Sequence, residues 1–320
     1  MSQFSATNAG VPAGPSHADN LFLKTFSGET LKIFHENTVQ KGRHRERTIK
    51  HGKSAQFPAI GGAVAEYHTP GHVILGQNIE HGEKVIAIDD LLTSSVFISN
   101  IEEAMNHYEV RKDFTFEVGK ALADANDQHL FAIAAKACIN GTTGAVTEMG
   151  PATVDNIGAA PTLSDIVQSF YDAAKHFDAT RVPKNERYAF VDYSVYWDLI
   201  KDGSLLDRDF GNDNGNQADG RIYKVAGFSI VPTANLAMNF GVDTIAGKRA
   251  GANVADYTVD ASNALILFQQ KQALGTVKLM NLATEKEYQV NRQGTLVVSK
   301  LAVGHGVLRP ECLRLVRASA

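Results

Sequence analysis

The chain has 320 residues, of which 44% are hydrophobic and 21% are charged, with a formal net charge of −4 and a pI near 6.3. This mild acidity gives the whole molecule no strong electrostatic attraction for nucleic acid. No apolar run reaches the roughly 18 residues of a membrane span, and the first residues lack the charged-then-apolar order of a signal peptide. Only Cys138 and Cys312 are cysteines, which indicates ordinary buried thiols in a reducing compartment.

The first 50 residues change composition twice. Residues 1–20 are rich in Ser, Ala, Asn, Gly and Pro, which predicts a segment that is mobile or ordered only against something else. Residues 21–34 carry apolar residues at near-helical spacing and predict a short amphipathic arm. Six cations, opposed only by Glu46, then follow within residues 41–53. These cations are Lys41, Arg43, Arg45, Arg47, Lys50 and Lys53.

The basic run has two interpretations. It could contact phosphates by charge alone, since no aromatic residues are interleaved with the cations to stack on bases. It could instead bridge subunits by pairing with acids such as Glu80, Glu83 and Asp89. The sequence favours bridging over contact with nucleic acid, and both interpretations stay open here.

Residues 54–90 have the texture of extended chain. Glycines and Pro70 separate short apolar runs at 57–60, 64–68 and 73–75, and residues 83–89 alternate with a period of two. The pattern predicts a long, bent hairpin, which is marginally stable by itself in water. Either the next domain or a neighbouring subunit would cover its apolar side chains, and we favour a neighbouring subunit. These side chains are Phe57, Ile60, Tyr67, Val73, Ile74 and Leu75.

The rest of the chain is organised around the stretch 100–140, which predicts a helix of about 30 residues, roughly 45 Å long. Asn100 and Glu103 have the arrangement of a helix start, Asn140-Gly141 is a typical stop, and the helix could break near Asn106-His107. We expect it to be the structural support of a sheet-packed domain. One apolar stripe is predicted along it. Its members are Phe114, Val118, Ala121, Leu122, Ala125, Ile133 and Ala137.

The remaining elements alternate irregularly between helix and strand. Thr162 and Asp165 predict the start of an amphipathic helix over residues 163–177. A buried strand at 188–192 is expected to lead into a helix at 193–200. Because helices and strands do not alternate as βαβ units, the predicted class is α+β. Further strands are predicted at 224–231, 265–268, 275–279, 295–303 and 313–316.

Motifs for chemistry are weak throughout. Asp209-Phe210-Gly211 matches a kinase tripeptide without the other kinase motifs, and residues 212–220 lack the ligands of a calcium loop. His68 and His72 are spaced for metal on a helix, but Pro70-Gly71 between them forbids that helix. We therefore predict no catalytic residue, no cofactor and no metal. A remote alternative is an α+β enzyme with its site in the loop 207–220.

Several stretches carry a resemblance to a known family. The strongest is IEEAMNHYEVR at 101–111, followed by GKSAQFP at 52–58 and KVIAIDDLLT at 84–93. LFLK at 21–24, GTVKL at 275–279 and GHGVLRPE at 304–311 complete the order. Together they resemble the major capsid proteins of short-tailed, T7-like phages, which adopt the HK97-like shell fold. Residues 141–272 are only vaguely similar to that family.

The resemblance implies the domain organisation. It implies an N-terminal arm at 1–50, an extended loop called the E-loop at 51–90, and a peripheral domain at 91–150 and 265–320. That domain would hold a long spine helix near 108–139, and an axial domain would occupy 151–264. Some relatives crosslink their subunits through an isopeptide bond between lysine and asparagine. The T7-like branch is not expected to do so, and no such pair can be placed in this sequence.

The resemblance also implies a function. The subunit would assemble as hexamers and pentamers into an icosahedral head that encloses double-stranded DNA. Its partners would be copies of itself, a scaffolding protein, a portal protein and the packaged DNA, with no membrane involved. Its location would be the virion, after assembly in the cytoplasm of the bacterial host. The alternative with the same fold is an encapsulin-type compartment.

Overall fold

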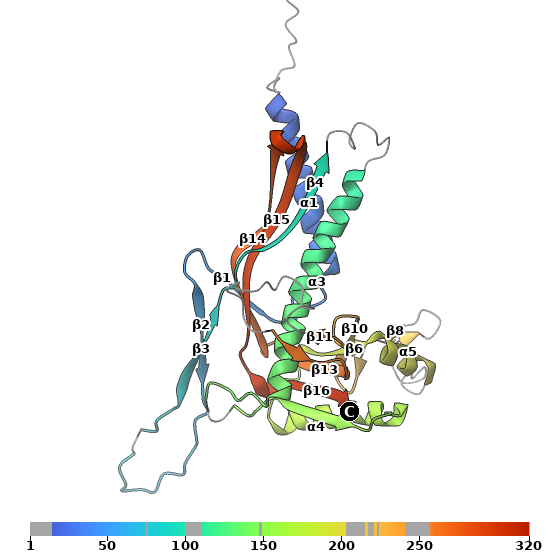
Figure 1. Ribbon diagram of the computed structural model, residues 1–320. Helices are drawn as coiled ribbons and strands as arrows, with labels where there is room; N and C mark the ends of the chain where they lie inside the picture. Colours follow the sequence, from blue (N-terminus) through green and yellow to red (C-terminus); the bar gives the residue numbers. More distant parts are fainter. Residues whose placement is uncertain are drawn as a thin grey trace, which may run out of the picture.

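The computed structural model describes most of the chain as two sheets, a projecting hairpin and four helices (Figure 1). The residues described are 15–74, 76–99, 110–146, 149–202, 215–216, 221–222, 224–240 and 257–319. The predicted helix start at Asn100 and the possible break at Asn106-His107 lie outside these residues.

Helices α1 (Pro15–Asn37) and α3 (Val110–Ile139) run side by side along a four-stranded sheet (Figure 1). Helix α1 starts at Pro15, earlier than the predicted arm and inside the segment expected to be mobile or ordered only against something else. The four-stranded sheet has β1 parallel to β14 and the other neighbours antiparallel. Its order is β1 (Arg45–Thr48), β14 (Leu274–Gln289), β15 (Gly294–Val307) and β4 (Leu92–Ser99), with the 3-10 turn Val290–Arg292 joining β14 to β15.

Helix α3 connects two apolar cores. Its first half packs Val118 and Leu122 against Leu301 and Val303 of β15. Its second half enters the largest core, and five side chains within 130–135, excluding Ile133, are fully buried. A helix that is apolar all round belongs inside a core, so the prediction of a single apolar stripe is wrong for this half. In the first half, Ala121, which was predicted to belong to the stripe, is exposed.

The helix ends where the sequence predicts. Gly141 has a φ of 57°, its N–H donates to the carbonyl of Cys138 at 3.1 Å, and the N–H of Thr142 donates to that of Ala137 at 2.9 Å. This left-handed stop satisfies carbonyl groups that the helix end would otherwise leave unpaired.

The second sheet has six strands and mixes distant parts of the chain. It is flanked by α4 (Leu163–Ala179) and α5 (Tyr193–Asp202). It crosses the predicted boundary between the axial and peripheral domains, and those boundaries stay a prediction. The strand order is β5 (Thr153–Ile157), β16 (Leu313–Ala318), β13 (Ala264–Gln270), β6 (Arg187–Asp192), β10 (Phe228–Thr233) and β9 (Lys224–Val225). Smaller elements are β7 (Gly215–Asn216), β8 (Arg221–Ile222), β11 (Asn239–Phe240), β12 (Val259–Asp260) and the 3-10 turn Pro310–Cys312.

Local signals explain two of these elements. Thr162 and Asp165 form the predicted capping box at the start of α4, with the Thr162 N–H donating to Asp165 Oδ2 at 2.9 Å. The single strand predicted at 224–231 is instead two strands. Ala226 and Gly227 both have positive φ, so the chain turns back between β9 and β10.

The hairpin leaves the body as a narrow ribbon (Figure 1). Strands β2 (Ser54–Ile60) and β3 (His81–Ala87) pair antiparallel from Ser54–Ala87 to Ile60–His81. Between them, the described residues of 61–80 form no strand, and the apolar runs at 64–68 and 73–74 lie in this irregular stretch.

Candidate interaction surfaces

The base of the hairpin is fixed to its own chain. Phe57 is only 7% exposed and, with Ala55 and Ile86, packs against Val277 and Leu308. Sequence reasoning favoured a neighbouring subunit over the next domain as the cover for this side chain, and for Phe57 that preference is wrong. Strand β14 and the turn after β15 cover the Phe57 side chain. They lie close to β2 because strands that are far apart in the sequence pair with one another.

Close backbone approach holds the other strand of the base. A Cβ at Gly304 would collide with the carbonyl oxygen of Ala87, and one at Gly306 would lie 2.9 Å from Ile86 Cγ1. Strand β15 therefore passes directly against β3, which only residues without a side chain permit. Gly304 and Gly306, which flank His305 in a strand, are the sequence signal from which this contact could have been predicted.

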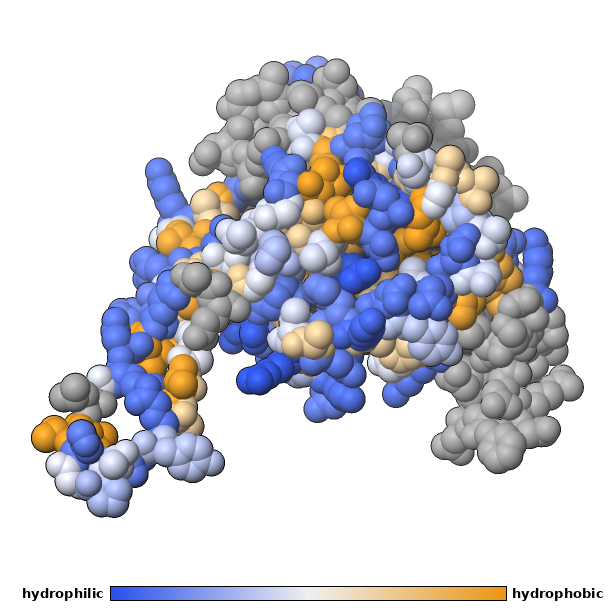
Figure 2. Space-filling model, turned by 90° about the horizontal axis from the view of Figure 1, so that it is seen from below, coloured by the Kyte–Doolittle hydropathy of each residue, from blue (hydrophilic) through white to orange (hydrophobic). Residues whose placement is uncertain are grey.

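The tip of the hairpin has the opposite character. Ile60, Val73 and Ile74 are each more than two-thirds exposed, and Tyr67 is fully exposed. Figure 2 shows the hairpin extending from the body as a narrow arm that carries apolar groups toward its end. The neck is closed by the Gly61 N–H donating to the Glu80 carbonyl at 2.8 Å. Leu75 lies outside the described residues.

Where the hairpin joins the body, polar side chains from several elements meet. The Tyr257 hydroxyl donates to the Asp89 carboxylate, and the Tyr257 ring stacks on His129 with centroids 4.3 Å apart. His305 shares a hydrogen bond with Thr276 at 2.9 Å, and burial, followed by the nearby His129, holds its pKa well below the ordinary value. This ring is therefore neutral at pH 7. Of these residues, sequence reasoning singled out only Asp89, as an acid that could pair with the basic run.

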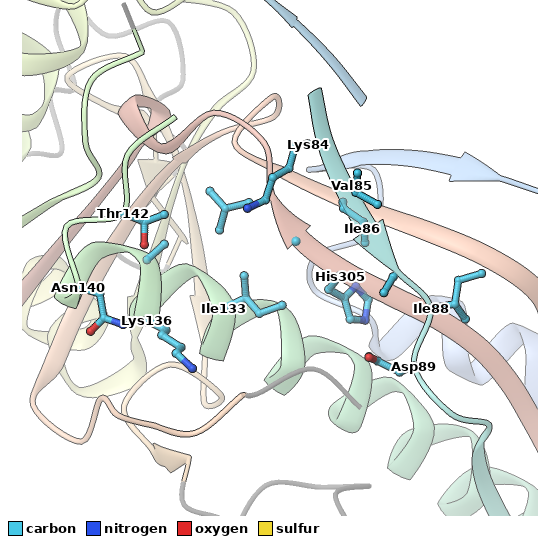
Figure 3. A pocket seen from close by; sticks show the side chains of 14 residues that line it. Lys84, Val85, Ile86, Ile88, Asp89, Ile133, Lys136, Asn140, Thr142 and His305 are labelled. Atoms are coloured by element: carbon cyan, nitrogen blue, oxygen red, sulfur yellow. The ribbon is translucent and has the colours of Figure 1, made fainter. Parts of the chain in front are cut away.

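A pocket of about 390 Å³ lies between β3, the end of α3 and β15 (Figure 3). Ile86, Ile133 and Val307 give it apolar walls, while Lys84 and Asn140 contribute polar groups. Among the described residues no group of three His, Cys, Asp or Glu side chains could hold a metal ion. His68 and His72 both lie exposed in irregular chain.

The loop proposed for an enzyme site falls mostly outside the described residues. Asp209-Phe210-Gly211 is not described, and within 207–220 only 215–216 are, paired with 221–222. None of the described helices is long and apolar enough to cross a membrane.

The basic run divides into two groups. Arg43 donates to the Val39 carbonyl and stacks over Tyr188, and Arg47 donates to the Gln56 carbonyl at 2.5 Å. Lys41, Arg45, Lys50 and Lys53 are exposed. Within the part of the chain that the structure describes, none of the six cations forms an ion pair with Glu80, Glu83 or Asp89. Arg43 and Arg47 therefore serve their own subunit, and four cations are available to something else.

The arm is fastened to α3 by Asp127, a residue that sequence reasoning also missed. Its carboxylate accepts hydrogen bonds from the N–H groups of Val39 at 2.5 Å and Gln40 at 3.3 Å. Burial raises the pKa of this carboxyl to about 7, although the two N–H groups act in the opposite direction.

This contact predicts a pH dependence of stability. The unfolded chain releases the Asp127 proton near pH 4, whereas the folded chain keeps it to about pH 7. The contribution of Asp127 to the free energy of unfolding is thus complete at low pH and is lost as the pH rises. Between pH 5 and 8 it falls by about 3 kcal/mol. Urea unfolding of the unassembled subunit at several pH values measures it. Asp127→Asn should remove this component, and parallel curves for both proteins would contradict the assignment.

The comparison with known families decides what kind of protein this is. The family described as Gp10A-like major capsid protein matches residues 56–315, which is most of the chain. The chain belongs to this family.

Individual members of the Gp10A-like family are similar over nearly the whole length. The major capsid protein of Enterobacteria phage T3 is 34% identical over 95% of this chain and 93% of its own. That of Escherichia phage T7 is 34% identical over 95% and 94%. The capsid structure of cyanophage P-SCSP1u has a TM-score of 0.75 at 34% identity and covers 99% of both chains. These relatives confirm the predicted family and HK97-like fold, and they favour a phage capsid over an encapsulin-type compartment.

Membership of the Gp10A-like family gives the chain its role. The Gp10A-like chain is a major capsid protein of T7-like phages and a component of the virion. Capsid proteins associate with copies of themselves to form a shell.

Proposed function

We propose that this subunit assembles through hexamers and pentamers into an icosahedral head that encloses double-stranded DNA. The observation that carries the proposal is the hairpin, whose base is buried in its own chain while its tip exposes large apolar side chains. Tyr67, Val73 and Ile74 are all exposed on one projecting arm, and leaving these apolar groups in water is costly. A neighbouring copy removes that cost by covering the tip.

The energetics suit reversible assembly. Each large apolar side chain buried at a contact contributes about 1.5–3 kcal/mol before ordering and association costs are subtracted. The exposed side chains of one tip therefore give a modest net free energy per contact. Because each subunit of a shell makes several such contacts, the whole assembly is stable while single misplaced subunits still dissociate.

The same proposal includes the other partners of the subunit and its domain boundaries. A scaffolding protein would guide assembly, a portal protein would occupy one vertex, and packaged DNA would be contacted non-specifically. Residues 1–50 would act as the arm, 51–90 as the extended loop, 91–150 with 265–320 as the peripheral domain and 151–264 as the axial domain. The subunit would have no catalytic role.

Negative-stain microscopy of the purified protein tests the proposal, with and without the scaffolding protein of the same phage. Closed shells of uniform diameter are expected. Sedimentation that shows only monomers under both conditions, with no shells on the grids, would overturn it.

The exposed cations of the basic run give a separate prediction. Replacing Arg45, Lys50 and Lys53 by glutamate should reduce shell formation, because these cations are free to bridge to a neighbouring subunit. Particle yield from infected cells and DNA per particle are the measurements. Normal yield with less DNA would favour phosphate contact instead. The same charge change at Lys120, Lys175 and Arg181, which are exposed elsewhere, is the control.

A further inference from the structure

His305 lies in β15 between Gly304 and Gly306, the two glycines that let β3 approach closely. Because successive residues of a strand point to opposite faces, the His305 ring points to the other face of β15. The residue is 4% exposed, and its ring centroid lies 6.2 Å from that of His129 on α3 and 6.5 Å from that of Tyr257. We call His129, Tyr257 and His305 the junction cluster. Strand β15 therefore contacts the hairpin with one face and this buried cluster with the other.

The junction cluster is connected to the hairpin through Asp89, which lies two residues after the end of β3. The Tyr257 hydroxyl donates to the Asp89 carboxylate, and the Asp89 N–H donates to the carbonyl of Val303 in β15 at 3.1 Å. Asp89 and His305 line the same pocket (Figure 3). The Tyr257 ring is stacked on His129 with an angle of 8° between the two planes. A displacement of Tyr257 therefore changes the position of Asp89, and with it the base of the hairpin.

The surroundings of His305 oppose a charge on its ring. Its Nδ1 shares a hydrogen bond with Thr276, and its Nε2 has no hydrogen-bond partner among the described residues. Burial, followed by the effects of His129, His44 and Lys278, holds the pKa of His305 well below its ordinary value. The ring is therefore uncharged while it stays in the junction cluster.

The ionisable groups around the junction cluster are mainly cationic. Two acids lie nearby, and each is already engaged, Glu46 with Lys278 at 2.5 Å and Asp89 with the Tyr257 hydroxyl. The charged groups that act on the His305 ring all oppose its protonation. An imidazolium at this position would thus meet repulsion from several elements. The cations are Lys84 of β3, Lys136 of α3, Lys278 of β14 and, when protonated, His129 of α3 and His44, which precedes β1.

We propose that the junction cluster fixes the base of the hairpin to the body only while His305 is neutral, and that proton uptake by this ring releases the base. The protonated ring is repelled by its cationic neighbours and moves toward water. Tyr257, which packs beside it, moves as well and no longer holds Asp89. The direction of the hairpin therefore depends on the protonation of one buried histidine. This inference goes beyond shell assembly, because it concerns the single subunit.

The direction of the pH effect follows from the two states. In the released state His305 contacts water and binds a proton near its ordinary pKa of 6.5, whereas in the attached state it binds one only at much lower pH. The attachment is therefore complete above pH 6.5 and weakens as the pH falls below it. One histidine shifts the equilibrium toward release by about 30-fold between pH 7.5 and pH 5.

Site-resolved amide hydrogen exchange of the full-length subunit, in solution too dilute for assembly, measures the release. Each rate is divided by the rate of the same amide in an unfolded peptide at the same pH. The Asp89 N–H is the reporter, because its acceptor is in β15, and its corrected rate should rise about 30-fold from pH 7.5 to pH 5. The Ile88 N–H donates to the Lys53 carbonyl at 2.8 Å within the hairpin and should change less than about threefold. An Asp89 rate that does not change with pH would overturn the proposal.

His305→Gln removes the titrating group and keeps an amide that can hydrogen-bond to Thr276. Its Asp89 rates at pH 7.5 and pH 5 should agree within about twofold. His176→Gln is the matched control, because burial also lowers the pKa of His176, which lies on α4. This control should keep the 30-fold rise. The same rise in His305→Gln, or its loss in His176→Gln, would contradict the role of His305.

Tyr257→Phe decides the matter if His305→Gln does not fold. Phenylalanine keeps the stacking on His129 and loses the hydrogen bond to Asp89, so Asp89 exchange should rise about tenfold at pH 7.5 and respond less to acid. An unchanged rate and an unchanged acid response would show that Tyr257 does not connect the cluster to the hairpin, which the proposal requires.

Asp127 provides a further control, since its contribution to stability has the opposite pH dependence. Global unfolding measures the sum of both effects, whereas exchange at Asp89 reports on the hairpin alone. Asp127 binds the N–H groups of Val39 and Gln40 in the arm. Asp127→Asn should therefore keep the acid response of Asp89. Loss of that response would assign it to the arm and overturn the proposal.

Discussion

A subunit in which residues 62–79 are replaced by an Asn-Gly turn is expected to fold normally and to form no shells. Ile60 and His81 end the strand ladder, and Gly61 is bonded to Glu80, so a two-residue turn closes the shortened hairpin. The described side chains among those removed are exposed and bury little within the chain. The free energy of unfolding should therefore stay unchanged or rise by about 1 kcal/mol, because a shorter loop costs less entropy to close.

Urea unfolding and negative-stain microscopy on the same preparation measure both outcomes. Phe57→Ala is the matched comparison, because it removes an apolar side chain from the base of the same hairpin. Since Phe57 is buried among Ala55, Ile86 and Val277, its loss should lower the free energy of unfolding by about 3–5 kcal/mol. Normal shells from the shortened hairpin would show that the tip has no bracing role.

Proline in place of Ala125 is expected to prevent the folding of the whole body. Ala125 is 4% exposed and lies at the middle of the 30-residue α3. Proline removes a backbone hydrogen bond and clashes with the preceding turn, which costs about 3 kcal/mol or more. The loss spreads because α3 packs against α1, β15, β4 and β16 at once. Insoluble expression, or a circular dichroism spectrum without cooperative melting, is the expected observation.

Two substitutions control for this result. Ala125→Gly keeps the N–H group and should cost only about 1 kcal/mol. Proline at Ala63, in the exposed loop of the hairpin, should leave stability nearly unchanged. A soluble, cooperatively melting Ala125→Pro protein would mean that α3 does not support the body as its position indicates.

Several parts of the fold follow from local sequence alone. The end of α3 is set by Asn140-Gly141, and the start of α4 by Thr162 and Asp165. The β2–β3 ribbon follows from its alternating residues, and β6 followed by α5 was also predicted. At the two helix ends a residue acts on backbone groups within a few positions of itself, so the signal survives without tertiary contacts. The strand predictions rest on the alternation or the apolar character of neighbouring side chains.

Other parts could not be predicted because they depend on partners far away in the chain. Strand β1 lies inside the basic run and exists because it pairs with β14. Asp127 reads as an ordinary surface acid of a helix, and only the arriving N–H groups of Val39 and Gln40 make it an anchor. The β9–β10 turn was missed because alanine rarely adopts the positive φ that Ala226 has here.

By itself the sequence determined that this protein has a long central helix, a projecting hairpin with an apolar tip and a segment of concentrated positive charge. Spacing and composition are enough for these features, since they depend on neighbours in the chain. Only the tertiary structure decided which apolar side chains stay exposed. Phe57 and Tyr67 look alike in sequence, yet β14 covers the first, and no described part of the subunit reaches the second. Burial depends on which distant strands arrive, and that is fixed by the pairing of the sheets.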